Sequence, residues 1–395
     1  MDHPELAALL TPDALRVLDR LGAVSSTDEA ASAVSRLRAE GHSPEFVSAV
    51  VGQARLRTRA VAKFGDFAAR MLFTRAGLEQ ASRLSVAAFH AGRFRDAGVT
   101  RVADLGCGIG GDALGFAGIG LHVLAVDADE ITAAIASYNL APFGDAVTVR
   151  HARAEDVDLA DVDAVWLDPA RRTAGHTETT RTRSQEWSPS PDWSFALAAR
   201  MPTGIKLGPG FDRSQIPPGV EAQWISVDGS TIELVLWSGG LAREGVGRAA
   251  LVVQGSSAHE LTAPGDAEDE PVGELGGYLH EPAGAVIRAR LIGEVARALD
   301  ARMVADGIAY LTSDEPRTSP FVQSFRILEQ LPADVKQLSR ALRERDLGTL
   351  EIKKRGVDVD PATLRTKLKL KGSRSATLVL TRVQRKRVAL LAERL

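Results

Sequence analysis

From Thr100 onward, short apolar runs alternate with stretches of helical periodicity, and this alternation restricts the possible folds more than any other feature of the chain. Neighbouring parallel strands need a long crossover connection, and an intervening helix supplies it. The alternation therefore predicts an α/β fold with a parallel sheet and right-handed crossovers. The five apolar runs are TRVADLG (100–106), LHVLAVD (121–127), AVTVRHA (146–152), DAVWLDP (163–169) and TGIKLGP (203–209).

Two further apolar runs close the predicted sheet. EAQWISV (221–227) and IELVLWS (232–238) are separated by DGST, which is typical of a tight turn. We expect these runs to form an antiparallel hairpin beside the five parallel strands. Together they predict one Rossmann-like domain over residues 99–245.

The segments on either side of this domain have different patterns. Residues 1–98 carry apolar positions three and four apart and predict an N-terminal helical region. Residues 246–310 are expected to connect two domains, through an acidic linker rich in Gly and Pro (264–282) and one helix (285–300). Residues 311–395 alternate again and predict a small, basic α+β domain.

Charge is segregated along the chain, although the formal net charge is only −3. Asp334–Leu395 contains seventeen Lys and Arg against seven Asp and Glu, an excess of ten positive charges. Such a surface is typical of proteins that follow nucleic-acid phosphates, with a solvated charged face as the alternative. We therefore expect RNA as a partner of this segment.

The sequence argues against several other classes of protein. Cys107 is the single cysteine, so no internal disulfide bond can form, and neither a signal peptide nor a long apolar stretch is visible. These features predict a cytoplasmic protein with no membrane partner. No Cys-x-x-Cys or His-x-x-x-His pair occurs, so we expect no metal. Nothing in the pattern indicates a particular oligomeric state.

A glycine-rich turn follows the first predicted strand, in VADLGCGIGGDA. Gly106, Gly108 and Gly110 let a ligand approach the backbone closely. The sequence also matches the Gly-x-Gly-x-x-Gly pattern of dinucleotide sites. Asp104, two residues before the first glycine, favours the ammonium group of S-adenosylmethionine, because a pyrophosphate gains nothing from a carboxylate there. Asp127 ends the second strand and is placed to accept both ribose hydroxyls of either cofactor.

The order of these motifs resembles a known family. DLGCGIGGDA, VLAVDAD, VWLDPARR and the closing hairpin resemble class I S-adenosylmethionine-dependent methyltransferases. KFGDFAARMLFTRAGLEQAS and the LDPARR corner resemble one bacterial branch, and LEIKKRGVDVDPATLRTKLKLKG resembles its C-terminal THUMP-like domain. The core is distantly similar to trimethylguanosine synthases, which methylate a guanine exocyclic amine in RNA. The resemblance covers most of the chain and implies S-adenosylmethionine as the cofactor and a seven-stranded core.

The resemblance also implies an acidic residue after the third strand that meets the adenine amine. In HARAED the corresponding position is Arg153. We expect Glu155 or Asp156 to take this role, and solvated charges at a strand end are the alternative.

The Asp-Pro corner after the fourth strand carries the predicted chemistry. In relatives that methylate amines, an Asp- or Asn-Pro-Pro-aromatic corner accepts the protons of the amine and stacks on the base. Asp168 and Pro169 keep the acceptor and the rigid turn, while Ala170 and Arg171 replace the second proline and the aromatic residue. Arg171 and Arg172 are expected to stack a guanidinium on a base or to bind a phosphate, with a salt bridge to a neighbouring acid as the alternative.

Three other residues near this corner have two interpretations each. Trp187 or Trp193 supplies the stacking aromatic, or both tryptophans cap the hydrophobic core. Lys206, at the end of the fifth strand, contacts phosphate or is simply solvated.

Taken together, the motifs predict an S-adenosylmethionine-dependent methyltransferase that acts on a base nitrogen of RNA. Two alternatives stay open. The enzyme acts on a small molecule or a protein and its basic segment is incidental, or the chain is a noncatalytic RNA-binding adaptor that retains the cofactor fold.

Overall fold

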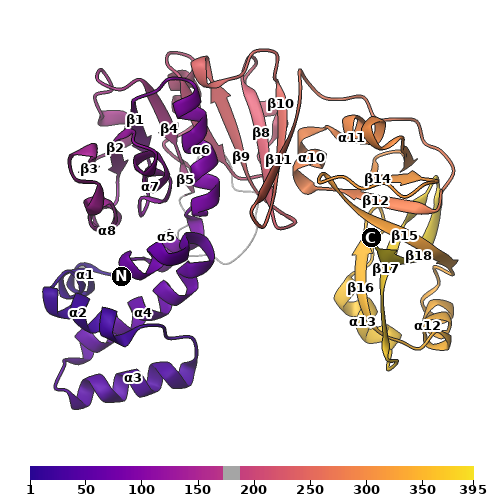
Figure 1. Ribbon diagram of the computed structural model, residues 1–395, viewed down its shortest axis with the longest axis horizontal. Coiled ribbons are helices and arrows are strands. Elements are labelled where there is room, and N and C mark those ends of the chain that lie inside the picture. The colour runs from indigo at the N-terminus through magenta and orange to yellow at the C-terminus, as the bar shows by residue number, and fades with distance from the viewer. Residues whose placement is uncertain (172–186) are drawn as a thin grey trace. The chain divides into compact units, whose positions relative to one another are not determined.

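The computed structural model describes residues 1–171 and 187–395, which form two compact units (Figure 1). The first unit comprises Met1–Leu207 with Leu236–Ala242. The second comprises Gly208–Val235 with Arg243–Leu395. Each unit contains both helices and strands, so the predicted α/β class is confirmed.

The first unit begins with helices that start at side-chain caps. Thr11 accepts a hydrogen bond from the backbone of Ala14 and precedes a proline at the first helical position. Ser26 and Glu29 form a capping box. These local signals agree with the helical periodicity predicted for residues 1–98. The helices are α1 (His3–Leu9), α2 (Pro12–Leu21), α3 (Thr27–Ala39), α4 (Pro44–Phe64), α5 (Arg75–Gln80) and α6 (Leu84–Asp96).

Five parallel strands form the sheet of the first unit, in the order β7-β4-β1-β2-β3. Each predicted apolar run contributes one of them, and helices connect most of the strands. Because the strands are parallel, their carboxyl ends meet along one edge of the sheet. The strands are β1 (Arg101–Leu105), β2 (His122–Asp127), β3 (Val147–His151), β4 (Ala164–Leu167) and β7 (Thr203–Leu207), and the connecting helices are α7 (Gly111–Gly118), α8 (Glu130–Leu140) and α9 (Pro191–Ala198).

Two tryptophans hold β4 and β7 together. Trp166 on β4 is fully buried, and its ring centroid lies 5.7 Å from that of Trp237 near the end of β9 (Ser230–Ser238). Gly204 on β7 lies under both rings, and a Cβ atom there would be 2.8 Å from each of them. This close packing fixes the ends of β4 and β7, which carry Asp168 and Lys206.

The predicted hairpin is present. β8 (Glu221–Val227) and β9 are joined by Asp228 and Gly229, whose φ angles of 48° and 82° are typical of the type I′ turn that links twisted strands. A second hairpin of β10 (Arg248–Gln254) and β11 (Ser257–Ala263) follows, with β10 parallel to β8. These two strands lie in the segment 246–310 that was expected to connect two domains.

The second unit also contains a seven-stranded sheet with the order β13-β14-β12-β15-β18-β17-β16. Its first three strands come from residues 278–313, and one of them, β12, pairs directly with the C-terminal strand β15. The domain boundaries remain a prediction, but residues before 311 contribute to this sheet. The strands are β12 (Tyr278–Pro282), β13 (Arg302–Ala305), β14 (Ile308–Ser313), β15 (Val322–Leu331), β16 (Leu347–Lys354), β17 (Arg374–Val383) and β18 (Lys386–Arg394).

The single helix predicted over residues 285–300 is wrong, because the structure has two. α10 (Gly284–Ala289) ends at Arg290, whose φ of 60° is left-handed, and α11 (Ile292–Leu299) begins two residues later. The backbone amide of Ala267 donates a hydrogen bond to the carbonyl of Arg290, which gives this carbonyl a partner outside a helix. The apolar periodicity continues across the break, and this is why the sequence did not reveal it.

Two helices cover the C-terminal part of the seven-stranded sheet, α12 (Val335–Glu344) and α13 (Pro361–Leu368). In Figure 1 α13 lies beside β16, and α12 contacts the same strand. Leucines from both helices and from the strands form one buried cluster. This arrangement confirms the predicted C-terminal α+β fold. No described helix has both the length and the apolar character needed to cross a bilayer.

Candidate active site

The glycine turn after β1 touches the Asp-Pro corner after β4. Gly106, Gly108 and Gly110 all have positive φ angles, of 89°, 56° and 89°. A Cβ atom on Gly106 would lie only 2.6 Å from the carbonyl oxygen of Asp168. The first position of the turn therefore requires glycine, because any side chain would push the two strand ends apart.

Asp104, near the end of β1, is a buried acid. Its side chain is fully buried, and neither carboxylate oxygen has a hydrogen-bond partner among the described residues. Burial, together with the neighbouring carboxylates of Asp112 and Asp168, raises the pKa of Asp104 well above its usual range. An unpaired buried carboxylate is costly, so this position fits a ligand that brings a positive charge.

Asp127, at the end of β2, is fixed against the glycine turn. One carboxylate oxygen accepts a hydrogen bond of 2.9 Å from the backbone amide of Gly108, and the other accepts one of 2.9 Å from Asp129. Burial nevertheless raises the pKa of Asp127. A carboxylate oxygen can accept more than one hydrogen bond, so this side chain is suited to receive ligand hydroxyls.

Asp168 forms an ion pair that its position in the sequence did not reveal. The ammonium group of Lys206 donates to Oδ2 of Asp168 at 2.6 Å and lies 3.7 Å from Oδ2 of Asp112. Only 11% of the Lys206 side chain is exposed, against 32% for Asp168. Lys206 is therefore not a solvated lysine, and its contact with Asp168 is a third possibility that the sequence did not suggest.

Asp112, a buried carboxylate on α7, supports Lys206. Asp112 accepts a hydrogen bond from Ser82 at 2.9 Å, and its other oxygen lies 2.8 Å from Nδ1 of His90. Burial alone would raise the pKa of Asp112, but Lys206 and His90 outweigh it and hold the pKa below its usual range. Asp112 is thus ionised at neutral pH and anchors the lysine. No motif marks Ser82 or His90, and only the fold brings them together.

The corner beyond Asp168 is described only in part. Pro169 is buried, and Ala170–Arg171 form the short strand β5, which pairs with β6 (Trp187–Ser188). Arg172 lies outside the described residues. Trp187 is half-buried, and so is Trp193 in the first turns of α9. The roles predicted for Arg171, Arg172 and the two tryptophans stay predictions.

The acids after β3 lie in a short 3-10 helix, Ala154–Asp156. The backbone amide of Ala152 donates to the carbonyl of Asp127, so this segment runs next to the end of β2. Glu155 is half-buried and lies 3.4 Å from the exposed guanidinium of Arg153, while Asp156 is exposed. Of the two candidates, Glu155 is the better shielded from solvent.

The structure thus brings Asp104, Asp127 and Asp168 with the glycine turn to one edge of the sheet in the first unit. Within the described part of the chain, no group of three or more His, Cys, Asp and Glu side chains could hold a metal ion. The arrangement combines an acceptor for a cation, an acceptor for hydroxyls and a rigid carboxylate corner.

Two parts of the chain match described families. Residues 322–394 match the family described as THUMP domain-like. Residues 2–60 match a family described only as a domain of unknown function.

The chain also has similar relatives. Uncharacterised S-adenosylmethionine-dependent methyltransferases from two strains of Mycobacterium tuberculosis are each 32% identical over 337 residues, which cover 83% of this chain and 90% of the relative. A solved structure of a candidate methyltransferase from Porphyromonas gingivalis has a TM-score of 0.71 and 19% identity, covering 100% of this chain and 99% of that one. This solved structure supports the fold of the chain, and the two mycobacterial relatives indicate its family.

Proposed function

The chain belongs to the S-adenosylmethionine-dependent methyltransferases, and from this premise we propose that it transfers the methyl group to a base nitrogen of RNA. The catalytic residues in this proposal are Asp168 and Pro169, with Arg171 and Arg172 binding the substrate. S-adenosylmethionine supplies a methyl group that positive sulfur already activates, so the protein has to orient the two reactants and exclude water.

The observation that carries the proposal is the position of the Asp168 carboxylate. It stands at the carboxyl end of β4, with its backbone against the glycine turn and its side chain held by Lys206. An amino group on a base carries protons that need an acceptor, and accepting them aligns the nitrogen lone pair. Pro169 fixes the backbone after the carboxylate, which keeps this acceptor in one orientation.

The cofactor-binding residues in this proposal are those of the glycine turn and the three strand ends. The Asp104 carboxylate, which has no donor among the described residues, would accept the ammonium group of the cofactor. Asp127 would accept the ribose hydroxyls and Glu155 or Asp156 the adenine amine. Gly106, Gly108 and Gly110 would line the path of the cofactor along the backbone.

RNA is the proposed substrate because the methyltransferase core is attached to a basic THUMP-like domain. The match to the THUMP-like family covers residues 322–394, which lie within the predicted basic domain. An excess of positive charge supports binding to a phosphate backbone. A small, neutral substrate would give this surface no role.

The substrate class can be tested by following a labelled methyl group. The purified chain is incubated with methyl-labelled S-adenosylmethionine and a lysate from a strain that lacks the enzyme, and the label is separated into RNA, protein and small molecules. We expect the label in RNA, with ribonuclease treatment before the reaction abolishing it. Label that stays in the protein or small-molecule fraction after ribonuclease treatment would contradict RNA as the substrate.

A further inference from the structure

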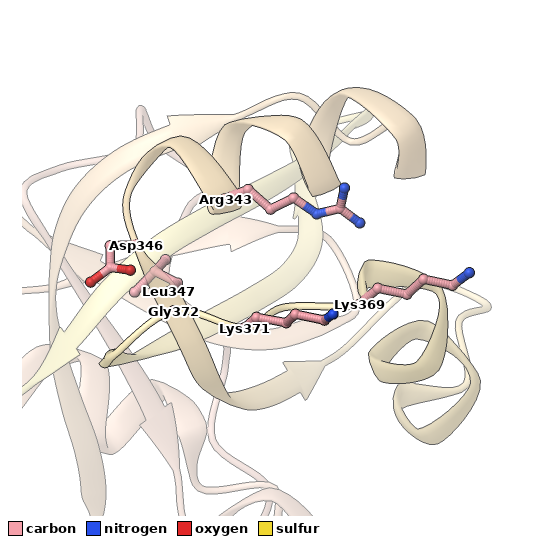
Figure 2. Close-up of a pocket in the computed structure, with 6 residues that line it drawn as sticks. All are labelled: Arg343, Asp346, Leu347, Lys369, Lys371 and Gly372. Atoms are coloured by element: carbon pink, nitrogen blue, oxygen red, sulfur yellow. The ribbon is translucent and has the colours of Figure 1, made fainter.

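A pocket in the C-terminal part of the second unit collects three cationic side chains. It lies where α12 ends, β16 begins and the loop after α13 passes (Figure 2). Its volume of about 510 Å³ lies in the range of small-ligand sites. The lining residues are Arg343, Asp346, Leu347, Lys369, Lys371 and Gly372.

The backbone builds one wall of this pocket. A Cβ atom on Gly372 would lie 2.1 Å from the backbone of Asp346, so only glycine allows the loop to approach β16 so closely. The amide of Gly372 donates to the carbonyl of Leu347, and the amide of Arg374 donates to the carbonyl of Asp346. The loop that carries Lys371 is therefore held at the start of the strand.

A second set of contacts fixes the helix ends that carry the other two cations. The carbonyl of Leu368, at the end of α13, accepts hydrogen bonds from Ser339 at 2.9 Å and from Arg343 at 3.2 Å. Both donors belong to α12, so the two helices are joined at this point. Lys369 follows directly in a left-handed conformation, with a φ of 48°. Arg343 and Lys369 thus have fixed backbone positions on either side of the pocket.

The charges in the pocket are separated. Figure 2 shows the side chains of Arg343, Lys369 and Lys371 extending to the same side, whereas Asp346 lies at the opposite end. Asp346 accepts a hydrogen bond from Ser373. Within the described part of the chain, no carboxylate pairs with the three cations. One side of the pocket therefore carries three positive charges without a counter-charge.

Other basic residues of the same sheet are already neutralised. The ammonium group of Lys353 lies 2.5 Å from Glu281, and Arg355 lies 3.5 Å from the other oxygen of Glu281. Both residues belong to the basic segment 334–395 for which the sequence predicts RNA as a partner. Because a carboxylate already holds them, they are less available to neutralise an RNA phosphate than the residues of the pocket.

We propose that this pocket binds a phosphate group of RNA through Arg343, Lys369 and Lys371. The ligand identity rests on the proposed function, because a phosphate belongs to the expected substrate. The guanidinium of Arg343 offers planar paired donors to phosphate oxygens, and the two ammonium groups add positive charge. The phosphate is either the 5′-terminal group or an internal one, and both have the same oxygen chemistry.

The test compares two triple variants of the full chain. The pocket variant carries Arg343→Gln, Lys369→Gln and Lys371→Gln. The control variant carries Arg385→Gln, Lys386→Gln and Arg387→Gln, three exposed residues in the turn before β18 and at the start of this strand, and thus loses the same net charge. Binding of labelled RNA, from a strain that lacks the enzyme, is measured by filter binding over a range of salt concentrations. The affinity for S-adenosylhomocysteine and the thermal unfolding of each variant show that it is folded.

We expect the pocket variant to reduce the log–log salt slope by about 0.7, since the pocket holds one phosphate and each lost phosphate contact contributes about 0.7. The control variant should keep the wild-type slope. Treating the RNA with phosphatase distinguishes the 5′-terminal phosphate from an internal one. If the pocket holds the 5′-phosphate, wild-type binding falls to that of the pocket variant, and if it holds an internal phosphate, binding is unchanged.

If the two variants have equal slopes while the wild type binds RNA in a salt-dependent way, the pocket is not a phosphate site. The proposal of an RNA methyltransferase would still stand. A failure of methyl transfer to RNA, with the pocket variant still impaired in RNA binding, would overturn the proposed function but not the phosphate site. Polyglutamate that binds as tightly as RNA through the same three residues would instead assign the pocket to an acidic peptide.

Discussion

At the scale of single residues, the chain buries the Asp104 carboxylate completely and gives it no hydrogen-bond donor among the described residues. A cationic ligand group would provide the missing partner. Burial raises the pKa of this carboxyl well above its usual range, which favours its protonated form in the free protein. A bound ammonium group would favour the charged form and displace that proton.

We therefore expect S-adenosylmethionine binding to release protons in the wild type. Asp104→Asn should abolish most of this release and weaken binding by roughly 1.5–3 kcal/mol, the range of a hydrogen bond to a charged group. Calorimetry in two buffers of different ionisation enthalpy measures the proton count. Asp28→Asn, at an exposed acid on α3, is the control. An unchanged proton count in Asp104→Asn would show that the ammonium group does not bind at Asp104.

Lys206 leads to a second prediction at this scale, because it joins Asp168 to Asp112. Lys206→Met leaves two carboxylates without their shared cation, and we expect a loss of stability of about 3–5 kcal/mol. A misplaced Asp168 should lower kcat about 100-fold, while the affinity for S-adenosylmethionine stays within a few fold.

Lys206→Arg keeps the charge and tests position alone, and Lys386→Met, at the exposed first residue of β18, is the matched control. Single-turnover rates and equilibrium binding separate the two effects. A Lys206→Met variant that folds and retains the wild-type rate would show that the ion pair has no part in transfer.

These residues differ in how well the sequence reveals them. Asp104, Asp127 and Asp168 stand at or near the ends of apolar runs, and parallel strands bring such ends to one edge. The partner of Lys206 cannot be read from the sequence, because thirty-eight residues separate it from Asp168. Only the packing of β4 against β7 makes them neighbours.

At the scale of elements, the strand β12 buries a histidine in the seven-stranded sheet. His280 is fully buried, with Ser324 and Ser313 hydroxyls 2.8 Å from its two ring nitrogens. Burial lowers the pKa of His280 from 6.5 to about 4. The folded sheet therefore keeps this ring neutral at a pH where the unfolded chain protonates it.

This difference makes the stability of the sheet depend on pH. Below pH 6.5 the unfolded state binds a proton that the folded state does not bind, so stability falls with pH until about pH 4. The contribution of this group over the window is about 3 kcal/mol. Urea unfolding of the wild type and of His280→Gln should therefore differ most at neutral pH and converge as the pH falls. A difference between the two that does not change with pH would contradict a neutral buried ring.

The elements themselves were predicted unevenly. The five parallel strands and the β8–β9 hairpin follow from their apolar runs and turn residues. β12 escaped prediction because YLHEP sits inside an acidic, Gly- and Pro-rich stretch, although its backbone is paired on both sides. Its hydrogen bonds come from strands far along the chain, and no local pattern encodes them.

At the scale of the whole molecule, the C-terminal sheet is larger than the THUMP-like match. One of its buried clusters draws Leu279, Val304, Ala305, Ile308 and Tyr310 from before residue 314, and Phe325, Val379, Val388, Leu390 and Ala392 from after it. The matched residues 322–394 alone would expose half of this cluster and one edge of β15.

We therefore expect a fragment of residues 264–395 to unfold cooperatively and a fragment of residues 322–395 to lack a cooperative transition. Circular dichroism during thermal unfolding of both fragments provides the measurement. A stable, cooperative fold of the shorter fragment would show that β12–β14 are dispensable for the sheet.

The most direct test of the proposed activity identifies the methylated product. RNA from a strain that lacks the enzyme is incubated with S-adenosylmethionine and either the wild type or Asp168→Ala, then digested to nucleosides and analysed by mass spectrometry. We predict one nucleoside methylated on a base nitrogen with the wild type, and none with Asp168→Ala, although the variant binds the cofactor within a few fold of the wild type. The same product from Asp168→Ala at the wild-type rate, or a methyl group on the ribose, would contradict the role assigned to the corner after β4.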